Sequence, residues 1–389
     1  MTPSSSQPAK PEAVRQNFSG QSLASQGLTS KDLTLAELSF ADLEGFAEDD
    51  HDEAFRVFRL SSAALVEDRP VLRQAVPPSP ALKAICRLAL TQAPGDRTQA
   101  RRFFEEHFRP FGVRATGASN GHAAGFLTGY YEPVVEGSLT RTADFTAPIL
   151  ARPDDLPSPA GGASAVGAEP YPDRAAIEAG AIAGQARPIV WLRDAIEVFL
   201  IQVQGSARVR LADGSLLRLV YAGRNGQPYT SIGHLLIEAG EIAEADMSLA
   251  RLKAWVRDHG QEPGEPGRTL MQRNRSYVFF ARDEELDPAA GPIGGQGVSL
   301  TPLRSIAIDR TIWPYSLPVW IAADLPWRSA SASPLRRLMV AQDTGSAIIG
   351  PARADIFFGA GDDAGARAGD IRNVGDFVVF LPAGESSPR

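Results

Sequence analysis

The sequence predicts a mainly β protein with helices in its N-terminal third. Apolar side chains recur three and four positions apart over residues 31–110, which is helical spacing. Beyond residue 120 the apolar period becomes two and glycine and proline become frequent, which favours short strands joined by turns. From about residue 276, six or so short apolar segments between glycines and prolines indicate a small barrel. A chain of 389 residues has room for about two domains.

The N-terminal third begins with a polar stretch and continues as helix. Residues 1–30 are rich in serine, glutamine and proline and are predicted to be disordered. Helical spacing then runs from LTLAELSF to LSSAAL, continues in SPALKAICRLAL, and ends at Pro110 after RTQARRFFEEHFRPF. The acidic run Glu48-Asp49-Asp50 is interpreted as a solvated turn.

The central segment contains the plainest hairpin. Over residues 199–223, apolar side chains alternate on both sides of the turn pair Asp213-Gly214, which predicts two antiparallel strands. Two helices follow, because TSIGHLLIEAG ends at Gly240 and SLARLKAWVRDHG is opened by Ser248. The C-terminal segments SYVFFA, SLTPLRSIAID, VWIAA, RRLMVAQD, ADIFFGAG and DFVVFLP are then expected to build the barrel.

Composition excludes several classes of function. The net charge of −7 argues against a nucleic-acid-binding surface, while neutral or zwitterionic polymers remain candidate substrates. The single cysteine, Cys86, lies in an apolar helical run and is expected to pack as a small hydrophobic side chain. The five histidines are scattered without ligand spacing, so neither a metal nor another cofactor is expected.

The sequence as written shows no export or membrane signal. Its first 30 residues lack the basic and apolar run of a signal peptide, and no cysteine that could be lipidated precedes Cys86. No window approaches the roughly 20 apolar residues that span a bilayer. These features predict a soluble protein, although removal of an export signal would leave the same sequence.

Three aspartates stand where β-segments end. Asp309 follows RSIAI, Asp343 follows LMVAQ, and Asp355 precedes IFFG. A carboxylate at a strand end projects into the loops, where sites are commonly built, although each could equally bond a backbone N–H of its own turn. If the strands are neighbours, the carboxylates converge and like charges raise one pKa. A carboxylic acid then stays protonated and can act as a general acid.

Two polar stretches could line a binding cleft. The first, GFLTGYYEPVVEGS at residues 125–138, offers hydroxyl groups and aromatic faces suited to sugar rings, or else forms a β-turn with buried tyrosines. The second runs from IQVQGSARVRL to YTSIG and offers amide and hydroxyl groups that pair with carbohydrate hydroxyl and N-acetyl groups. The candidate binding residues are Thr128, Gly129, Tyr130, Tyr131, Glu132, Gln202, Gln204, Gly205, Ser206, Tyr221, Asn225 and Tyr229.

Other chemistries fit the sequence poorly. No GxSxG motif precedes a helix, and GPIGGQGVS lacks the GKS or GKT of a phosphate-binding loop. Asp343-Thr344-Gly345 is the tripeptide of aspartic peptidases. Those enzymes need two facing aspartates, and DTG occurs once in this chain.

Several longer motifs closely resemble the membrane-bound lytic murein transglycosylase A family, in family order over roughly residues 120 to 382. They are LTGYYEP, IQVQGSA, YAGRNGQPYTSIG, RSYVFF, SLTPLRSIAIDRTIWP and LMVAQDTGSAIIGPARADIFFGAGDDAGARAG. The resemblance implies a double-psi β-barrel domain with a second β-domain inserted into it, and a glycan bound in the groove between them. The barrel domain and its helical region would take residues 31–132 and 286–389, and the insert residues 133–285.

The resemblance also implies an enzyme that cleaves the β-1,4 bond between N-acetylmuramic acid and N-acetylglucosamine in peptidoglycan and leaves a 1,6-anhydro end. The family's catalytic aspartate falls on Asp355, and Asp343 and Asp309 match the other members of its three-aspartate motif. Its cleft-lining segment and its IQVQGS strand match Thr128, Tyr130, Tyr131, Gln202, Gln204 and Ser206.

The same resemblance implies partners and a location. Peptidoglycan glycan strands would be the substrate, proteins of cell-wall synthesis or remodelling are further candidate partners, and a monomer is expected. Family members are typically outer-membrane lipoproteins, so a periplasmic location with outer-membrane association is implied. Two alternatives remain open. A non-catalytic peptidoglycan-binding protein would keep the groove without the acid, and an aspartic peptidase would need a second DTG-like loop or a homodimer.

Overall fold

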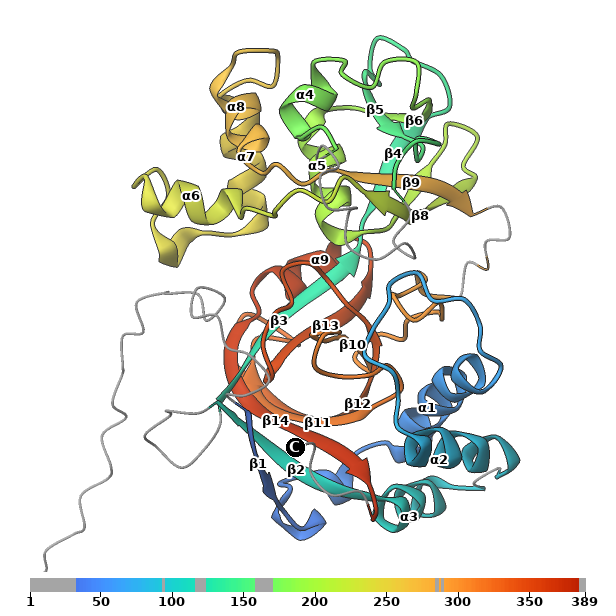
Figure 1. Cartoon of the computed structure of the whole chain (residues 1–389). Helices are drawn as coiled ribbons and strands as arrows, with labels where there is room; N and C mark the ends of the chain where they lie inside the picture. The colour runs from blue at the N-terminus through green and yellow to red at the C-terminus, as the bar shows by residue number, and fades with distance from the viewer. Residues whose placement is uncertain are drawn as a thin grey trace, which may run out of the picture.

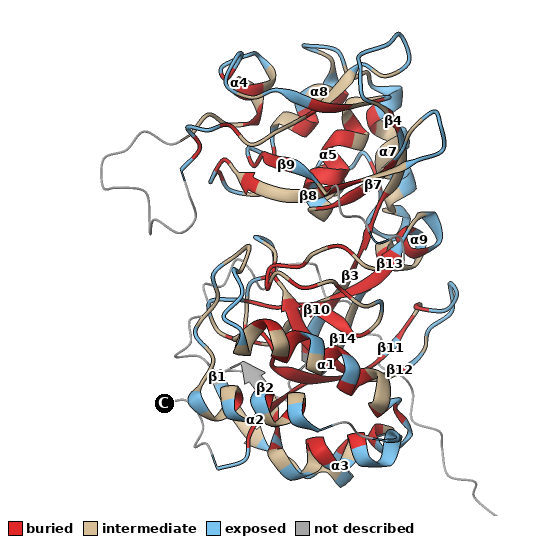
Figure 2. Ribbon diagram, turned by 90° about the vertical axis from the view of Figure 1, so that its right-hand side faces the viewer, coloured by how far each residue is buried: buried red, intermediate tan, exposed pale blue. Residues whose placement is uncertain are grey.

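The computed structural model describes residues 33–92, 95–115, 124–157, 171–283, 287 and 290–384. These residues form two β-rich bodies, one above the other in Figure 1. The lower body is a barrel with helices beside it, and the upper body is a second sheet with helices packed against it. Figure 2 shows that each body has its own buried interior. Residues 1–30, predicted to be disordered, lie outside the described ranges.

Six strands of the lower body close into a barrel in the order β14-β11-β12-β10-β13-β3, with β14 pairing to β3. The parallel pairs are β10 with β12 and β3 with β13, and the other neighbours run antiparallel. The strands are β3 (Ala124–Glu132), β10 (Ser305–Ala307), β11 (Pro318–Leu325), β12 (Ser333–Asp343), β13 (Arg353–Ala360) and β14 (Arg372–Pro382). The predicted small barrel in the C-terminal part of the chain is therefore confirmed for five of its segments. SYVFFA was wrongly assigned to it, because this segment forms β9 (Val278–Asp283) of the upper sheet, and β3 completes the barrel.

Strand β12 shows why these segments read as continuous apolar runs. Five consecutive residues, from Leu338 to Gln342, are buried. One face of the strand packs inside the barrel and the other meets helix α1 (His51–Val66). A strand covered on both faces needs no alternation of polar and apolar side chains.

Three helices cover one side of the barrel: α1, α2 (Pro80–Thr91) and α3 (Arg97–His107). Each begins at a side chain that accepts a backbone N–H, namely Asp50, Ser79 and Asp96. The helical prediction fails before α1. Residues Leu33–Glu37 form strand β1, which pairs with β2 (Phe108–Ala115) at the edge of the barrel sheet. The local sequence LTLAE alternates, and pairing with β2 satisfies its backbone.

A buried arginine fastens α1 to the barrel. Arg304 is fully buried, and its guanidinium donates to both carboxylate oxygens of Asp49 at 2.7 and 2.9 Å and to Glu53 at 2.7 Å. It also donates to the Leu338 carbonyl at 2.8 Å. The interpretation of the acidic run as a solvated turn was therefore wrong for Asp49, which is buried as the partner of Arg304.

The upper body is a six-stranded sheet in the order β5-β6-β4-β7-β8-β9. Its strands are β4 (Val134–Ser138), β5 (Ala147–Leu150), β6 (Pro188–Leu192), β7 (Ala207–Arg210), β8 (Leu216–Arg224) and β9 (Val278–Asp283). Its helices are α4 (Arg174–Glu178), α5 (Ala195–Gln204), α6 (Ile232–Glu238), α7 (Leu249–Asp258) and α8 (Pro266–Gln272). The predicted helices α6 and α7 begin after Ser231 and Ser248, whose hydroxyl groups accept backbone N–H groups.

The hairpin prediction for residues 199–223 was wrong in its first half. Residues up to Gln204 belong to helix α5, and only β7 and β8 form the hairpin around Asp213-Gly214. The run AIEVFLIQVQ is apolar on nearly all sides, so it fits a buried helix as well as a strand. The segment forms a helix because Asp194 caps its start and Gly205 ends it with φ +86°.

Strand β3 carries the chain from one body to the other. It ends at Glu132, and β4 begins two residues later at Val134. Figure 1 shows β3 rising out of the barrel toward the upper sheet. At this junction the side-chain Oε1 of Gln204, at the end of α5, accepts the backbone N–H of Tyr131 at 3.1 Å. In the described ranges, no helix combines the length and apolar character needed to cross a bilayer.

Replacing Arg304 with methionine should destabilise the barrel by about 3–5 kcal/mol, because the carboxylate of Asp49 would stay buried without its cation. Urea unfolding followed by the fluorescence of buried Trp320 measures the loss. The matched control is Arg56→Met, which breaks an exposed ion pair with Asp52 and should cost at most about 1 kcal/mol. Equal effects of the two variants would show that the buried contact has no special importance.

Candidate active site

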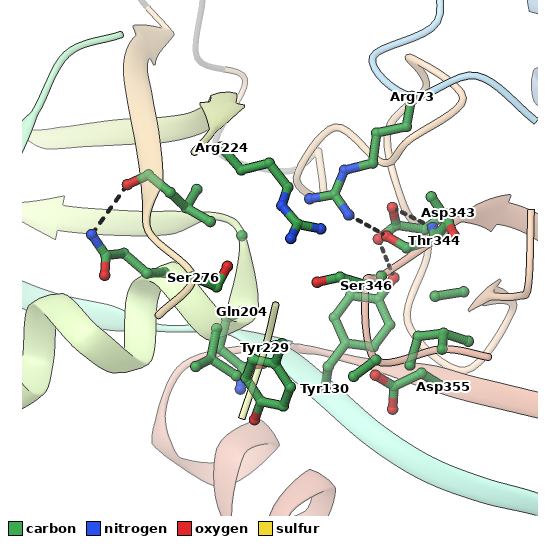
Figure 3. Close-up of a pocket in the computed structure, with 18 of the residues that line it drawn as sticks. Arg73, Tyr130, Gln204, Arg224, Tyr229, Ser276, Asp343, Thr344, Ser346 and Asp355 are labelled. Carbon is green, nitrogen blue, oxygen red and sulfur yellow. Dashed lines mark hydrogen bonds between the residues drawn. The ribbon is translucent and has the colours of Figure 1, made fainter. Parts of the chain in front are cut away.

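A cavity of about 230 Å³ lies between the barrel and the upper sheet (Figure 3). The barrel and its loops contribute Arg73, Gly129, Tyr130, Ala307, Asp343, Thr344, Gly345, Ser346, Ala347, Ile348, Arg353 and Asp355. The upper body contributes Arg174, Gln202, Val203, Gln204, Gly205, Arg224, Tyr229, Asn274, Ser276 and Val278. Two of the three predicted aspartates, Asp343 and Asp355, therefore face the same space.

Strand register sets the positions of these two aspartates. On the small strand β10, Ala307 pairs with Asp343 of β12 on one side and with Asp355 of β13 on the other. Asp355 in turn pairs with Thr128 of β3. The four residues thus form one row across adjacent strands. Because two inter-strand spacings separate them, the backbones of Asp343 and Asp355 lie about 10 Å apart, with the small side chain of Ala307 between them.

Asp355 is held by a short relay of hydrogen bonds. The hydroxyl of Thr128 donates to its carboxylate, and Arg353 Nη2 donates to that hydroxyl oxygen at 2.7 Å. Burial raises the pKa of Asp355, and the negative charge of Asp343 adds to the rise. The Arg353 charge and the Thr128 hydrogen bond oppose it. The net effect favours a protonated carboxylic acid at higher pH than for an ordinary aspartate.

Asp343 accepts more hydrogen bonds than Asp355. Its carboxylate takes the hydroxyl of Tyr130 at 2.8 Å and the backbone N–H groups of Gly295 at 2.7 Å and Thr344 at 2.8 Å. Burial raises the pKa of Asp343, while nearby Arg73 and these donors oppose the rise. Burial also raises the pKa of Tyr130 well above its usual range, so its hydroxyl remains a donor.

Close approach of Gly295 to Asp343 requires a residue without a side chain. A Cβ at this position would lie 2.5 Å from the Tyr315 hydroxyl and 3.3 Å from Oδ1 of Asp343. Gly129 is constrained in a similar way, because a Cβ there would meet Ala368 at 2.8 Å. Ala368 belongs to helix α9 (Asp362–Gly369), which the sequence analysis did not predict. Both glycines let backbone segments pack tightly around the row of carboxylates.

The third aspartate, Asp309, lies outside the cavity lining. It is buried, and its carboxylate accepts the N–H and hydroxyl of Thr311 at 3.0 and 2.7 Å and the N–H of Gly350 at 2.7 Å. Gly350 belongs to the loop between β12 and β13, whose Gly345 and Ser346 line the cavity. Asp309 therefore positions this loop. The prediction that its carboxylate converges with those of Asp343 and Asp355 was wrong.

Several predicted binding residues also have structural roles. Glu132 is fully buried and pairs with Arg208 at 2.7 Å and Arg218 at 3.1 Å, which joins the end of β3 to strands β7 and β8. Asn225 is buried and bonds the backbone of Pro172, Arg275 and Tyr277.

The remaining candidates divide between the cavity and its surroundings. Gln202, Gln204 and Gly205 line the cavity, and the buried Oε1 of Gln202 has no hydrogen-bond partner among the described residues. Ser206 and Tyr131 are buried outside the lining, and Tyr221 lies beneath the guanidinium of Arg73, which is 4.2 Å from its ring centroid.

Sequence reasoning missed the cationic side chains of the cavity. Arg73 comes from the loop after α1, Arg224 from the end of β8, and Arg353 from the start of β13. No periodic pattern or motif marks the first of these. Tyr229, which Figure 3 shows between the upper body and Asp355, was noticed only as one hydroxyl among several. Burial, and to a smaller extent the charge of Asp355, raise the pKa of Tyr229.

The cavity can supply proton transfer and hold a polar polymer. Asp355 offers a carboxylic acid with a raised pKa, and amide, hydroxyl and guanidinium groups face it from the other wall. In the described part of the chain, no three histidine, cysteine or acidic side chains are grouped as metal ligands. An acid placed opposite such polar groups suits the cleavage of a glycosidic bond.

Comparison with known proteins gives consistent matches. The family described as "MltA specific insert domain" matches residues 126–281, and "3D domain" matches residues 304–381. Membrane-bound lytic murein transglycosylase A of Escherichia coli K12 is 34% identical over 283 residues, which are 71% of this chain and 72% of the relative.

Solved structures extend the similarity to most of the chain. The crystal structure of a membrane-bound lytic murein transglycosylase from Agrobacterium tumefaciens has a TM-score of 0.77 and 34% identity, and the match covers 90% of this chain and 98% of that one. Escherichia coli MltA with bound chitohexaose has a TM-score of 0.64 and 28% identity, with 90% and 94% covered.

Replacing Glu132 with glutamine should lower the stability of the protein by about 3–5 kcal/mol, because the buried Arg218 and the partly buried Arg208 lose the carboxylate that both contact. Chemical denaturation measures this loss. Glu136→Gln is the matched control, since its pair with Arg193 is exposed and should contribute at most about 1 kcal/mol. A raised KM with unchanged stability would instead identify Glu132 as a substrate contact.

Proposed function

The chain belongs to the membrane-bound lytic murein transglycosylase A family, and we propose that Asp355 performs both proton transfers of its reaction. The protein is a peptidoglycan lytic transglycosylase. We propose that it cleaves the β-1,4 bond between N-acetylmuramic acid and N-acetylglucosamine and leaves a 1,6-anhydro-muramyl end. The observation that supports Asp355 most directly is its position in the cavity, as a carboxyl group with a raised pKa.

The reaction needs one acid and one base in succession. Protonated Asp355 gives its proton to the glycosidic oxygen, the bond from C1 of N-acetylmuramic acid breaks, and N-acetylglucosamine leaves with a free hydroxyl. The resulting Asp355 carboxylate then removes the proton from the C6 hydroxyl of the same muramyl ring. The C6 oxygen bonds to C1, so the acid is regenerated and no water is consumed.

A single carboxylic acid suffices because the nucleophile is part of the substrate. Ordinary glycosidases need two carboxylates, one of them for a water molecule or as the nucleophile. Here the C6 hydroxyl is tethered to the reacting ring, and favourable intramolecular reactions gain about 7–11 kcal/mol from such proximity. General acid and base catalysis adds about 10²–10⁴-fold.

The hydrogen bonds favour Asp355 over Asp343 as the acid. Asp343 accepts from Tyr130, Gly295 and Thr344, which occupy both carboxylate oxygens. Asp355 receives one donor, the Thr128 hydroxyl, from the described residues. A carboxyl group with an unoccupied oxygen can give and take a proton, whereas the three donors around Asp343 favour its carboxylate form and oppose the effect of burial on its pKa. Asp343 therefore supplies a negative charge that supports the raised pKa of Asp355.

The same spacing argues against an aspartic peptidase. The two carboxylates of such enzymes share one proton at about 3 Å. Here strand β10 lies between the strands of Asp343 and Asp355, so the two side chains start about 10 Å apart. The other alternative from the sequence, a non-catalytic peptidoglycan-binding protein, disagrees with the relatives, which are lytic transglycosylases.

The barrel type, the inserted domain and the cellular location are proposed from the family. We propose that the barrel is of the double-psi type, which its two parallel strand pairs support, and that residues 133–285 form the inserted domain. Gln202 and Gln204 would hold the glycan from the insert side. The membrane-bound relatives indicate an envelope-associated protein, and we propose a monomer that acts in the periplasm at the outer membrane.

Asp355→Asn should lower turnover of purified peptidoglycan by at least about 10³-fold, because asparagine can neither donate nor accept the transferred proton in the same way. Release of anhydro-muropeptides, followed by mass spectrometry, measures the effect, while sedimentation with sacculi checks that binding persists. Asp363→Asn, on the exposed face of α9, is the matched control and should behave as wild type. Near-normal product release by the Asp355 variant would refute the assignment.

The pH dependence of kcat/KM should report the pKa of Asp355. The acid must be protonated, so activity falls as pH rises through its raised pKa. Thr128→Val removes a hydrogen bond that lowers this pKa, so the alkaline limb should move to higher pH. Asp343→Asn removes a negative charge that raises it, so the limb should move to lower pH. Limbs that stay in place, or that move in the reverse directions, would mean that another group titrates.

A further inference from the structure

Two arginines point toward each other across the cavity. Figure 3 shows the guanidinium groups of Arg73 and Arg224 entering the space between the two bodies from opposite walls. Arg73 belongs to the loop after α1, on the barrel side, and Arg224 ends strand β8 of the upper body. Both side chains line the same cavity as Asp355.

Each guanidinium has N–H donors for which the described residues provide no acceptor. Arg73 donates to the Thr344 carbonyl at 3.0 Å and stacks over Tyr221. Arg224 donates from Nη2 to the Gln227 carbonyl, and its buried Nε has no hydrogen-bond partner. A guanidinium has five N–H donors. Among the described residues, no carboxylate lies within ion-pair distance of either arginine, whereas Arg174 and Arg304 in the same structure have such partners.

The surroundings of Arg224 are cationic. Burial lowers the pKa of Arg224, Tyr221 opposes this effect, and the charges of Arg73 and Arg310 add to it. Like charges brought together out of bulk water repel each other and lose hydration. Asp343 and Asp355 line the same cavity, but neither lies within ion-pair distance of Arg73 or Arg224, so the two guanidinium groups form a local positive charge in a chain of net charge −7. A bound anion would offset both costs.

We propose that Arg73 and Arg224 together bind a carboxylate of the glycan substrate. The inference rests on the proposed function, because peptidoglycan supplies the anion. N-acetylmuramic acid carries a lactyl group whose carboxylate is free once the stem peptide has been removed, and stem peptides carry carboxylates of their own. N-acetylglucosamine carries none. Guanidinium forks match the planar geometry of a carboxylate, which favours arginine over lysine at such a site.

The site would make the enzyme selective for muramyl sugars near the point of cleavage. The two arginines come from opposite walls, so a carboxylate held by both also fixes the glycan relative to Asp355. The alternative is that each arginine only braces its own loop, Arg73 through Thr344 and Arg224 through Gln227. Under that alternative, substitution would affect charged and uncharged glycans equally.

Calorimetric binding to full-length Asp355→Asn protein tests the proposal. The ligands are a peptide-free tetrasaccharide of alternating N-acetylglucosamine and N-acetylmuramic acid, its peptide-bearing counterpart, and chitotetraose, which has no carboxylate. Arg224→Gln, Arg224→Lys and Arg73→Gln are compared with Arg87→Gln. Arg87 is an exposed arginine on α2, so its variant loses the same charge far from the cavity.

Arg224→Gln and Arg73→Gln should each weaken binding of a carboxylate-bearing ligand by about tenfold, with chitotetraose affected less than twofold. Arg224→Lys should recover part of the loss. A loss confined to the peptide-free ligand identifies the lactyl carboxylate, and a loss confined to the peptide-bearing ligand identifies a stem carboxylate. Equal losses for chitotetraose, or values equal to those of Arg87→Gln, would overturn the proposal.

The binding test of the two arginines can fail independently of the proposed reaction. Binding is measured in a variant without turnover, so the arginines can fail the test while the wild-type enzyme still releases anhydro-muropeptides. Conversely, wild-type protein that releases none would refute the reaction, and the binding comparison would still show whether the two arginines recognise a carboxylate.

Discussion

The parallel pairing of β3 with β13 is the constraint on which the rest of the site depends. It sets Thr128 beside Asp355, and the neighbouring β10 sets Ala307 between Asp355 and Asp343. The same strand β3 closes the barrel against β14 and then runs directly into the second body. One strand therefore fixes the acid and also anchors the wall that faces it. A shift of one residue in its register would turn Thr128 away from the carboxylate.

Asp343 and Asp355 have different electrostatic environments although both are buried aspartates in the same cavity. Burial raises the pKa of both Asp343 and Asp355, but the hydrogen-bond donors around them differ. Three donors converge on Asp343, while a single hydroxyl reaches Asp355. Environment separates the roles of two carboxyl groups here, as it does in other enzymes that pair an acid with a charged carboxylate. The third aspartate, Asp309, shapes a loop of the cavity from behind.

Sequence patterns predicted most of the barrel and a convergence of three aspartates, of which two line the cavity, because strand ends and turn residues leave local signals. They failed where an apolar run fitted two structures, as in α5, whose caps at Asp194 and Gly205 decide for a helix. They also could not separate polar residues that hold the fold from those that face the cavity. Glu132 and Gln204 come from equally polar motifs, yet the first is an internal ion-pair partner. Arg73 and Arg224 were missed because only the tertiary structure brings two distant segments together.

The central claim is that the C6 hydroxyl of the substrate, and no water molecule, attacks the muramyl carbon after Asp355 has protonated the leaving group. Digestion of purified peptidoglycan by the wild-type protein in water enriched in ¹⁸O tests this most directly. The account predicts 1,6-anhydro-muramyl products without ¹⁸O, as read by mass spectrometry. Reducing muramyl ends that carry one ¹⁸O atom would contradict it, since they would show that water is the nucleophile.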